Sequence, residues 1–264
     1  MKRLSAILVL CLAACSIGGA EKHWNIAEEF EKQGQYLRAI EEYSRIVNMG
    51  QRNPIAIKAQ VQIARIYDKN LHDYPRAIRA YRDAYRRSED KRTKMESRWA
   101  IADIYSNQLQ NSPAASEEYQ ALFQELARGQ KEGPEVLLTW AKSLMDAGKF
   151  DESAVRYEEF RKLYPGHKEG PRTLLEEGHA RLADRRPDQA MALFREFITK
   201  FGGVNGYTSM VAEAYYGLGS ALEAQDELSA ALEAFRASLS TYPNPKVIEL
   251  KIQRVEKRKK ERRL

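Results

Sequence analysis

The stretch AYYGLGSALEAQDELSAALEAFRASLSTYP, residues 214–243, decides the fold of this chain. In its second half, the small residue Ala231 precedes the large ring of Phe235 by four positions, and Ser238 follows three positions later. Residues spaced by three or four lie on one face of an α-helix. This spacing therefore predicts a helix with a small, a large and a medium side chain on its buried face.

The first half of the same stretch predicts another helix. Leu218, Gly219 and Leu222 have the pattern apolar–small–x–x–apolar, which also lies on one helical face. A turn around Asp226 separates the two helices, and Pro243 closes the unit because proline does not continue a helix. The stretch therefore predicts a helix–turn–helix unit.

The spacing of Ala231 and Phe235 recurs along the whole chain. The earlier pairs are Ala39/Tyr43, Ala77/Tyr81, Ala115/Tyr119, Ser153/Tyr157 and Ala190/Phe194. Successive small residues are 38, 38, 38, 37 and 41 positions apart, whereas aromatic residues make up only 9% of the chain. A recurrence this regular is not accidental, and a fixed period of this length predicts stacked helical repeats.

The first-helix pattern is present in every copy except the fifth. The matching segments begin at Ile26, Ile63, Ile101, Trp140 and Leu218. In the fifth copy, Glu177 and Arg181 occupy the apolar positions around Gly178. We therefore expect the first helix of this repeat to be shifted or locally irregular. The second and third copies have one extra residue in the turn.

These features resemble the tetratricopeptide repeat, a helix–turn–helix unit of 34 residues. The sixth copy matches best, through Tyr215, Leu218, Gly219, Leu222, Ala231, Phe235 and Pro243. The resemblance implies an all-α fold, a right-handed superhelical solenoid of about six repeats over residues 21–245. Residues 246–264 form a basic helix or tail, in which apolar positions 248, 252 and 255 predict a helix that caps the last repeat.

Residues 1–14 have the features of a secretory signal peptide. Two basic residues, Lys2 and Arg3, precede an apolar run from Leu4 to Ala14. A run of this length is too short to span a bilayer as a permanent helix.

The four residues Leu12-Ala13-Ala14-Cys15 resemble the bacterial lipobox. The resemblance implies cleavage before Cys15 and lipidation of its thiol, so that palmitate labels the protein. It also implies a lipidated tether over residues 15–20. Ser16, in place of aspartate, implies the periplasmic face of the outer membrane. The alternative is an ordinary signal peptide that is cleaved near Ala14 or Ala20.

The excess positive charge lies at the C-terminal end. The chain has a formal net charge of +6, and residues 251–264 alone contain eight basic and two acidic residues. The candidate contact residues are Lys257, Arg258, Lys259, Lys260, Arg262 and Arg263. They either solvate a terminal cap with a frayed end or contact anionic headgroups, lipopolysaccharide or an acidic partner. Nucleic acid is not an expected partner, because an exported chain does not meet it.

No motif in the sequence predicts catalysis. The four histidines do not pair at a metal-binding spacing, and no glycine-rich phosphate loop, HExxH or CxxC motif is present. We therefore expect no enzyme activity, no catalytic residue, no cofactor, no bound metal and no small-molecule substrate.

The resemblance implies that exposed positions of the first helices line a groove for a protein partner. An apolar row contains Trp24, Val61, Trp99, Leu138, Leu175 and Tyr216, and a polar row contains Glu28, Arg65, Asp103, Lys142, His179 and Ser220. Such rows suit an extended segment or a helix of a partner. Trp24 and Trp99 either anchor this partner or pack against adjacent repeats.

A lipid-anchored array of this kind resembles two groups of bacterial lipoproteins. Leu163-Tyr164-Pro165 and Thr241-Tyr242-Pro243 are similar to repeat endings in β-barrel assembly lipoproteins of the BamD type, and six repeats are typical of type IV pilus pilotins. The resemblance implies a non-catalytic scaffold that assembles or braces an outer-membrane barrel or secretin complex. The alternatives are an adaptor of a peptidoglycan enzyme or of a motility or secretion system.

Overall fold

The computed structural model of the protein describes residues 18–50 and 53–262, and every regular element within these ranges is helical. The chain divides into two units, Met1–Lys131 and Glu132–Leu264. The predicted all-α class is confirmed. The proposed signal peptide, Cys15 and Arg263 lie outside the described residues.

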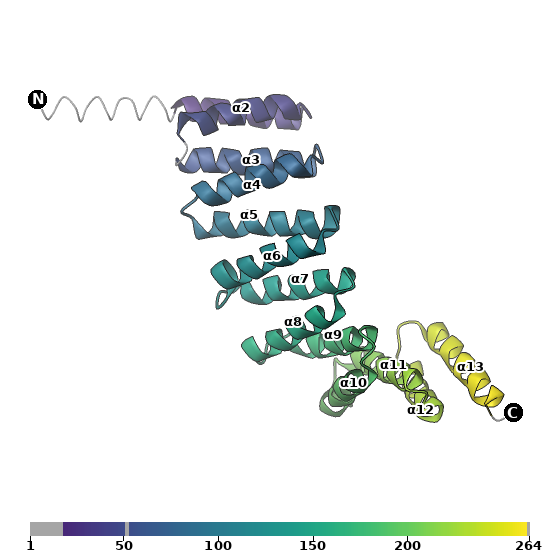
Figure 1. Cartoon of the computed structure of the whole chain (residues 1–264). Helices are drawn as coiled ribbons and strands as arrows, with labels where there is room; N and C mark the ends of the chain where they lie inside the picture. Colours follow the sequence, from purple (N-terminus) through teal and green to yellow (C-terminus); the bar gives the residue numbers. More distant parts are fainter. Residues whose placement is uncertain (1–17, 51–52, 263–264) are drawn as a thin grey trace, which may run out of the picture. The chain divides into compact units, whose positions relative to one another are not determined.

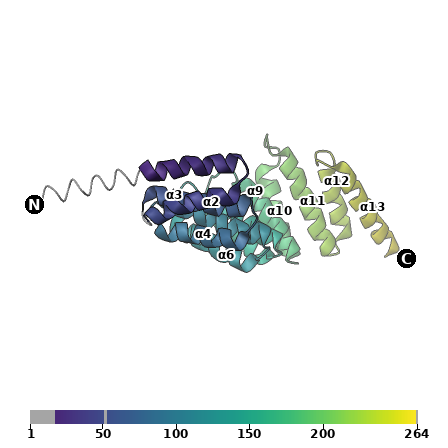
Figure 2. The ribbon, with the colours of Figure 1, turned by 90° about the horizontal axis from the view of Figure 1, so that it is seen from above.

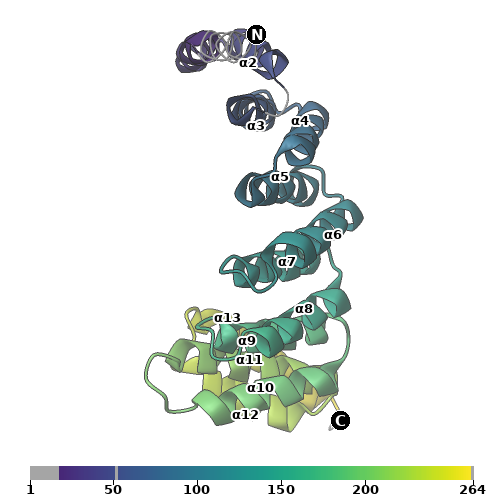
Figure 3. The same ribbon diagram turned by 90° about the vertical axis from the view of Figure 1, so that its left-hand side faces the viewer.

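The described residues of unit 1 form three antiparallel helix pairs (Figure 1). A first helix over residues 18–32 pairs with α2 (Tyr36–Met49), and α3 (Pro54–Lys69) pairs with α4 (Tyr74–Arg87). In the third pair, α5 (Lys91–Asp103) and η1 (Ile104–Gln108) precede α6 (Ser112–Ala121) and η2 (Leu122–Ala127), where η marks π-helical turns. Figure 3 shows α3 and α5 in one layer, with α4 and α6 in a second layer beside them.

Unit 2 contains three further pairs and a terminal helix. The pairs are α7 (Gly133–Asp146) with α8 (Phe150–Leu163), α9 (Gly170–Ala183) with α10 (Pro187–Phe201), and α11 (Thr208–Ala224) with α12 (Leu228–Leu239). The last helix, α13 (Pro245–Glu261), packs against α12, as predicted for a cap (Figure 2). Because α9 also packs against α11, the first helices of successive repeats are neighbours.

Side-chain caps determine where several helices of unit 1 begin. The side chains of Asn53, Asp73, Asp90 and Asn111 each accept a hydrogen bond from a backbone N–H in the first turn, at 2.8–3.2 Å. These caps satisfy N–H groups that have no partner within the helix. Three of the four helices also have proline in the first turn, where its missing N–H costs nothing.

All six predicted small–large pairs are buried. The small members are fully buried, and no ring of the six is more than 5% exposed. In the fourth repeat, the hydroxyl of Ser153 also donates to the backbone carbonyl of Ala141 on the preceding helix, at 2.7 Å. The small–large pair is therefore the repeated contact between the two helices of each repeat.

Phe194 shows how close this contact is. A Cβ atom added to Gly178 on α9 would lie 2.7 Å from the Phe194 ring, and one added to Gly217 on α11 would lie 2.4 Å from it. Both separations are shorter than van der Waals contact, so only glycine fits at these two positions. The ring of the second helix therefore fills a gap between two successive first helices.

The turns within the repeats follow the same period. One residue in each adopts the left-handed conformation, namely Gly34, His72, Gln110, Gly148, Arg185 and Asp226. In four turns the next N–H bonds to the carbonyl five residues earlier, which is the Schellman arrangement. In the second and third repeats, the N–H that follows the left-handed residue bonds instead to the carbonyl six residues earlier, at 2.8 Å. The predicted extra residue is thus accommodated within the turn.

The predicted irregularity in the first helix of the fifth repeat is wrong. Helix α9 is regular, and Glu177 and Arg181 are only 5% and 9% exposed. Glu177 pairs with Arg161, and Arg181 Nη1 lies 2.5 Å from Asp151 Oδ1. Buried charges are tolerated when they are paired. Ion pairs therefore replace apolar packing at these two positions without changing the register of the helix.

We expect Gly217→Ala to lower the free energy of unfolding by about 1–3 kcal/mol, because the added methyl group overlaps the Phe194 ring. In an unobstructed helix the same change raises stability by roughly 0.5–1 kcal/mol. Gly170→Ala is the control, because nothing lies within 4 Å of its added Cβ. Urea titration followed by circular dichroism measures both variants. An unchanged or higher stability of Gly217→Ala contradicts the proposed packing.

We expect Arg185→Gly to raise the free energy of unfolding by about 0.5–1 kcal/mol, because φ of Arg185 is 58° and glycine adopts this conformation without strain. Gly148 occupies the equivalent turn position with φ of 72°, so Gly148→Ala should lower stability by about 1 kcal/mol. The pair is measured by the same titration. Shifts in the same direction would show that the turn conformation does not limit stability.

Candidate partner-binding surface

The predicted groove residues of unit 1 lie on its three first helices. Trp24, Val61 and Trp99 are partly buried, Arg65 is exposed, and Asp103 is half-buried. Each of these side chains retains some accessible surface. The three helices together therefore present a mixed apolar and charged row.

Trp24 contributes to packing as well as to this surface. Its ring meets Tyr43 edge-on at a centroid distance of 5.2 Å, and its Nε1 donates to Glu28 Oε1 at 2.9 Å. Both Trp24 and Val61 pack against the hydrophobic core of unit 1. The two alternatives considered for Trp24 are thus combined in one residue, because its ring is partly packed and partly accessible.

Trp99 differs from Trp24 in this respect. It is partly buried on α5, but it is not among the described residues that pack against the hydrophobic core cluster of unit 1. Large aromatic rings that are accessible in the free protein often dominate binding energy at interfaces. Trp99 is therefore a candidate for an anchor in this row.

The charged positions of unit 1 are held by neighbouring polar groups. Arg65 Nη1 donates to Gln62 Oε1 at 3.3 Å. Asp103 accepts a hydrogen bond from Asn107 at 2.5 Å, and its carboxylate lies 3.9 Å from Lys69 Nζ. These contacts fix one cation and one carboxylate on adjacent helices, so the surface has a defined charge pattern.

Burial also affects the pKa of Tyr81, which lies near Arg65. Desolvation raises the pKa of the Tyr81 hydroxyl to about 12, and the nearby Arg65 charge opposes part of this increase. The phenol of Tyr81 therefore stays protonated at neutral pH.

In unit 2, the predicted groove residues occupy different environments. Leu138 is partly buried and Lys142 is exposed on α7, whereas Leu175 on α9 is fully buried, so its predicted place in the apolar row is wrong. Tyr216 on α11 packs against Tyr242 at a centroid distance of 5.2 Å. Lys251 Nζ of α13 lies 5.9 Å from the centre of the Tyr216 ring.

A charged cluster on α9 and α11 was not predicted, apart from His179. Arg172 lies 2.7 Å from Glu213 and 2.7 Å from Glu176, and His179 Nε2 lies 3.3 Å from Glu213. Burial raises the pKa of Glu213. Hydrogen bonds and charges from His179 and Arg172 lower this pKa by a larger amount, so its net shift is downward. The helical spacing of 172, 176 and 179 was the available signal.

The basic C-terminal helix is attached to the sixth repeat by ion pairs. Glu223, at the end of α11, contacts Arg254 at 2.6 Å and Arg258 at 3.0 Å. Asp226, in the following turn, contacts Arg258 at 3.2 Å and also pairs with Arg262. These contacts favour the capping role for Arg258 and Arg262.

Three other predicted contact residues of α13 are less engaged. Lys257 Nζ lies 3.9 Å from Glu261 on the same exposed surface. Lys260 is exposed and Lys259 is partly buried. Contact of these three lysines with a membrane or an acidic partner stays a prediction.

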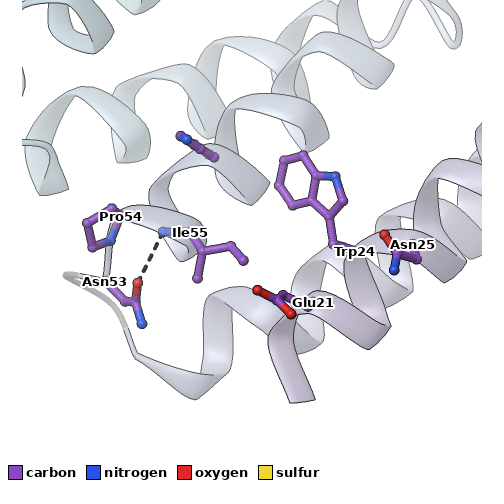
Figure 4. Close-up of a pocket in the computed structure, with 7 residues that line it drawn as sticks. Glu21, Trp24, Asn25, Asn53, Pro54 and Ile55 are labelled. Carbon is purple, nitrogen blue, oxygen red and sulfur yellow. Dashed lines mark hydrogen bonds between the residues drawn. The ribbon is translucent and has the colours of Figure 1, made fainter. Parts of the chain in front are cut away.

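A pocket of about 500 Å³ lies in unit 1 between the first helix and the start of α3 (Figure 4). Its lining residues are Glu21, Trp24, Asn25, Asn53, Pro54, Ile55 and Lys58. Figure 4 shows the indole ring of Trp24 and the side chains of Ile55 and Glu21 in the space between these two helices. The sequence did not indicate this pocket, because its two walls are about 30 residues apart.

In residues 18–50 and 53–262, no group of three or more histidine, cysteine, aspartate or glutamate side chains is arranged to hold a metal ion. Within the same part of the chain, no helix combines the length and the apolarity needed to cross a bilayer.

Comparison with known families gives two matches, both in unit 2. Tetratricopeptide-repeat models match residues 135–167 and residues 175–244. These segments correspond to the fourth repeat and to the fifth and sixth repeats. No curated protein matches the chain.

Solved structures with the same fold are also repeat proteins. The C-terminal part of a TPR repeat-containing protein from Cytophaga hutchinsonii is 18% identical, with 93% of each chain covered and a TM-score of 0.63. YrrB, described as a TPR protein with an unusual peptide-binding site, is 12% identical. The match covers 80% of this chain and 97% of YrrB, with a TM-score of 0.53.

The repeat matches and the paired-helix fold agree with each other, and tetratricopeptide repeats serve as scaffolds for protein–protein interaction. Residues 135–167 and 175–244 therefore match tetratricopeptide repeats in sequence, and the described helix pairs have the fold of such repeat proteins.

Proposed function

We propose that this protein is a non-catalytic scaffold of the bacterial cell envelope, anchored by lipid at Cys15, which assembles or braces an outer-membrane complex. The observation that carries the scaffold role is the row of accessible groove residues on the three first helices of unit 1. Trp99 supplies a large ring, while Arg65 and Asp103 supply opposite charges. Such a surface suits a helix or an extended segment of a protein partner.

The envelope location rests on the lipobox-like residues 12–15. Gly18, the first residue of the first helix, follows Cys15 by only three positions. Three residues span at most about 11 Å, so lipidation at Cys15 would hold the first helix close to the bilayer. A partner that is embedded in the same membrane, such as a barrel or a secretin, would be within reach.

This short tether favours a membrane partner over one in the cell wall. The alternative, an adaptor of a peptidoglycan enzyme, requires binding to that enzyme or to sacculi. A pull-down on purified sacculi separates the two, because only the alternative leads to retention of the protein.

We expect Trp99→Ala to weaken capture of the membrane partner by about fivefold or more, since an accessible aromatic anchor contributes over 1 kcal/mol. Thermal stability should change little, because part of the Trp99 side chain is accessible on α5. Leu37→Ala is the control, since Leu37 is 61% exposed on a second helix. Affinity purification from membranes, with mass spectrometry, gives the readout. A large loss of thermal stability with intact capture would assign Trp99 to the core.

We expect radioactive palmitate to label the wild-type protein but not Cys15→Ala, and the variant to leave the membrane fraction, because a bilayer anchor needs the acyl chains. Deleting the protein should reduce the amount of an assembled envelope complex while its subunits are still synthesised. Absence of label in the wild type would refute the anchor. Normal assembly of every co-purifying partner after deletion would refute the scaffold role.

A further inference from the structure

The pocket between the first helix and α3 combines an apolar wall with two opposite charges. Trp24, Pro54 and Ile55 supply the apolar side chains, and Glu21 and Lys58 supply one carboxylate and one ammonium group from different helices. A volume of about 500 Å³ is within the usual range for small-ligand pockets. The pocket therefore suits an amphipathic group that has both charges and an apolar portion.

The pocket lies at the end of unit 1 that the anchor would hold. Pro54 is the first residue of α3, and Trp24 lies six residues after Gly18, the start of the first helix. At 1.5 Å per residue, Trp24 is about 9 Å along this helix. Cys15 is at most about 11 Å before Gly18, so the anchored bilayer is within about 20 Å of the Trp24 ring.

Additional apolar surface lies at the same end. Met49, at the end of α2, is 45% exposed, and its Cε is 3.7 Å from the position of a Cβ added to Gly19. An exposed methionine beside the start of the first helix costs solvation in water but not at a lipid surface. The ring of Trp24 is also a type of side chain that favours the interface between membrane and water.

The charges of the pocket select among lipid surfaces. A zwitterionic phospholipid headgroup has one ammonium group and one phosphate. The carboxylate of the pocket can pair with the ammonium group, and the ammonium group of the pocket can pair with the phosphate. A surface made for anionic lipids would instead present several cations and no carboxylate. Charge complementarity thus favours the zwitterionic headgroup.

We propose that this pocket binds a zwitterionic phospholipid headgroup of the bilayer that carries the Cys15 anchor. Lys58 pairs with the phosphate, Glu21 pairs with the ammonium group, and Trp24, Pro54 and Ile55 contact the glycerol and first methylene groups. The proposal rests on the lipid anchor of the proposed function. It adds an orientation, in which the anchored end of unit 1 lies on the membrane and the row around Trp99 stays accessible.

The test uses the full-length, lipidated protein in vesicles of brominated phosphatidylcholine, which quenches nearby tryptophan fluorescence. Trp99→Phe retains Trp24 as the reporter in unit 1, and Trp24→Phe retains Trp99, while the buried Trp140 is common to both. We expect at least about twofold stronger quenching with Trp24 present, because an interfacial ring lies at headgroup depth. Equal quenching of the two variants, or none, overturns the proposal.

Charge reversal tests the headgroup contact in the Trp99→Phe background. Lys58→Glu should reduce the quenching of Trp24 toward the level of the Trp24→Phe variant. Lys22→Glu is the matched control, because Lys22 is exposed on the same end of the first helix but does not line the pocket. Circular dichroism confirms that each variant is folded. Equal loss in both variants would indicate general attraction to the membrane and would overturn the specific site.

The lipid label distinguishes failure of this proposal from failure of the anchor. A labelled, vesicle-bound protein with unquenched Trp24 leaves the proposed function intact and overturns only the headgroup site. Absence of the label overturns the anchor itself. Shielding of Trp24 from acrylamide by a co-purified protein, in the absence of lipid, would assign the pocket to that protein and also overturn the proposal.

Discussion

The close contact between a ring on each second helix and small residues on the first helices is the constraint on which the fold depends. Phe194 of α10 meets Gly178 of its own repeat and Gly217 of the next one, so one side chain joins α9, α10 and α11. Because the ring leaves no space for a Cβ at either position, the spacing of these helices is set within a fraction of an ångström. Phe194 thus sets the spacing of α9 and α11 in unit 2.

Much of this fold could be predicted from the sequence, because its signal is periodic. The buried pairs and the left-handed turn residues recur at the same intervals of 38, 38, 38, 37 and 41 positions. The exception is the first helix of the fifth repeat. Glu177 and Arg181 predicted that this helix is irregular, and this prediction was wrong for a physical reason. A local pattern assigns charged residues to the surface, whereas their partners Arg161 and Asp151 come from α8, on the neighbouring repeat. Pairing between elements, which a linear pattern does not contain, decided the burial.

The candidate site was less predictable, for the same reason. Helical position alone identified Trp99 and Arg65 as accessible, but it also placed Leu175 in the groove, although that side chain is fully buried. The cluster around Glu213 and the attachment of α13 through Glu223 both depend on residues from different helices. Accessibility at a repeat position is therefore a property of the neighbouring repeats as well as of the residue itself.

The surface and the proposed anchor constrain each other. If lipid at Cys15 holds the first helix within about 11 Å of a bilayer, unit 1 is limited to orientations in which its first pair lies near the membrane. Trp24 and Trp99 occupy equivalent positions on first helices, yet only Trp24 lines the pocket at the anchored end. Equivalent residues of unit 1 can thus face different surroundings, because α5 follows the proposed anchor by more residues than the first helix does. This gradient allows one type of surface to contact lipid at one end and protein further along.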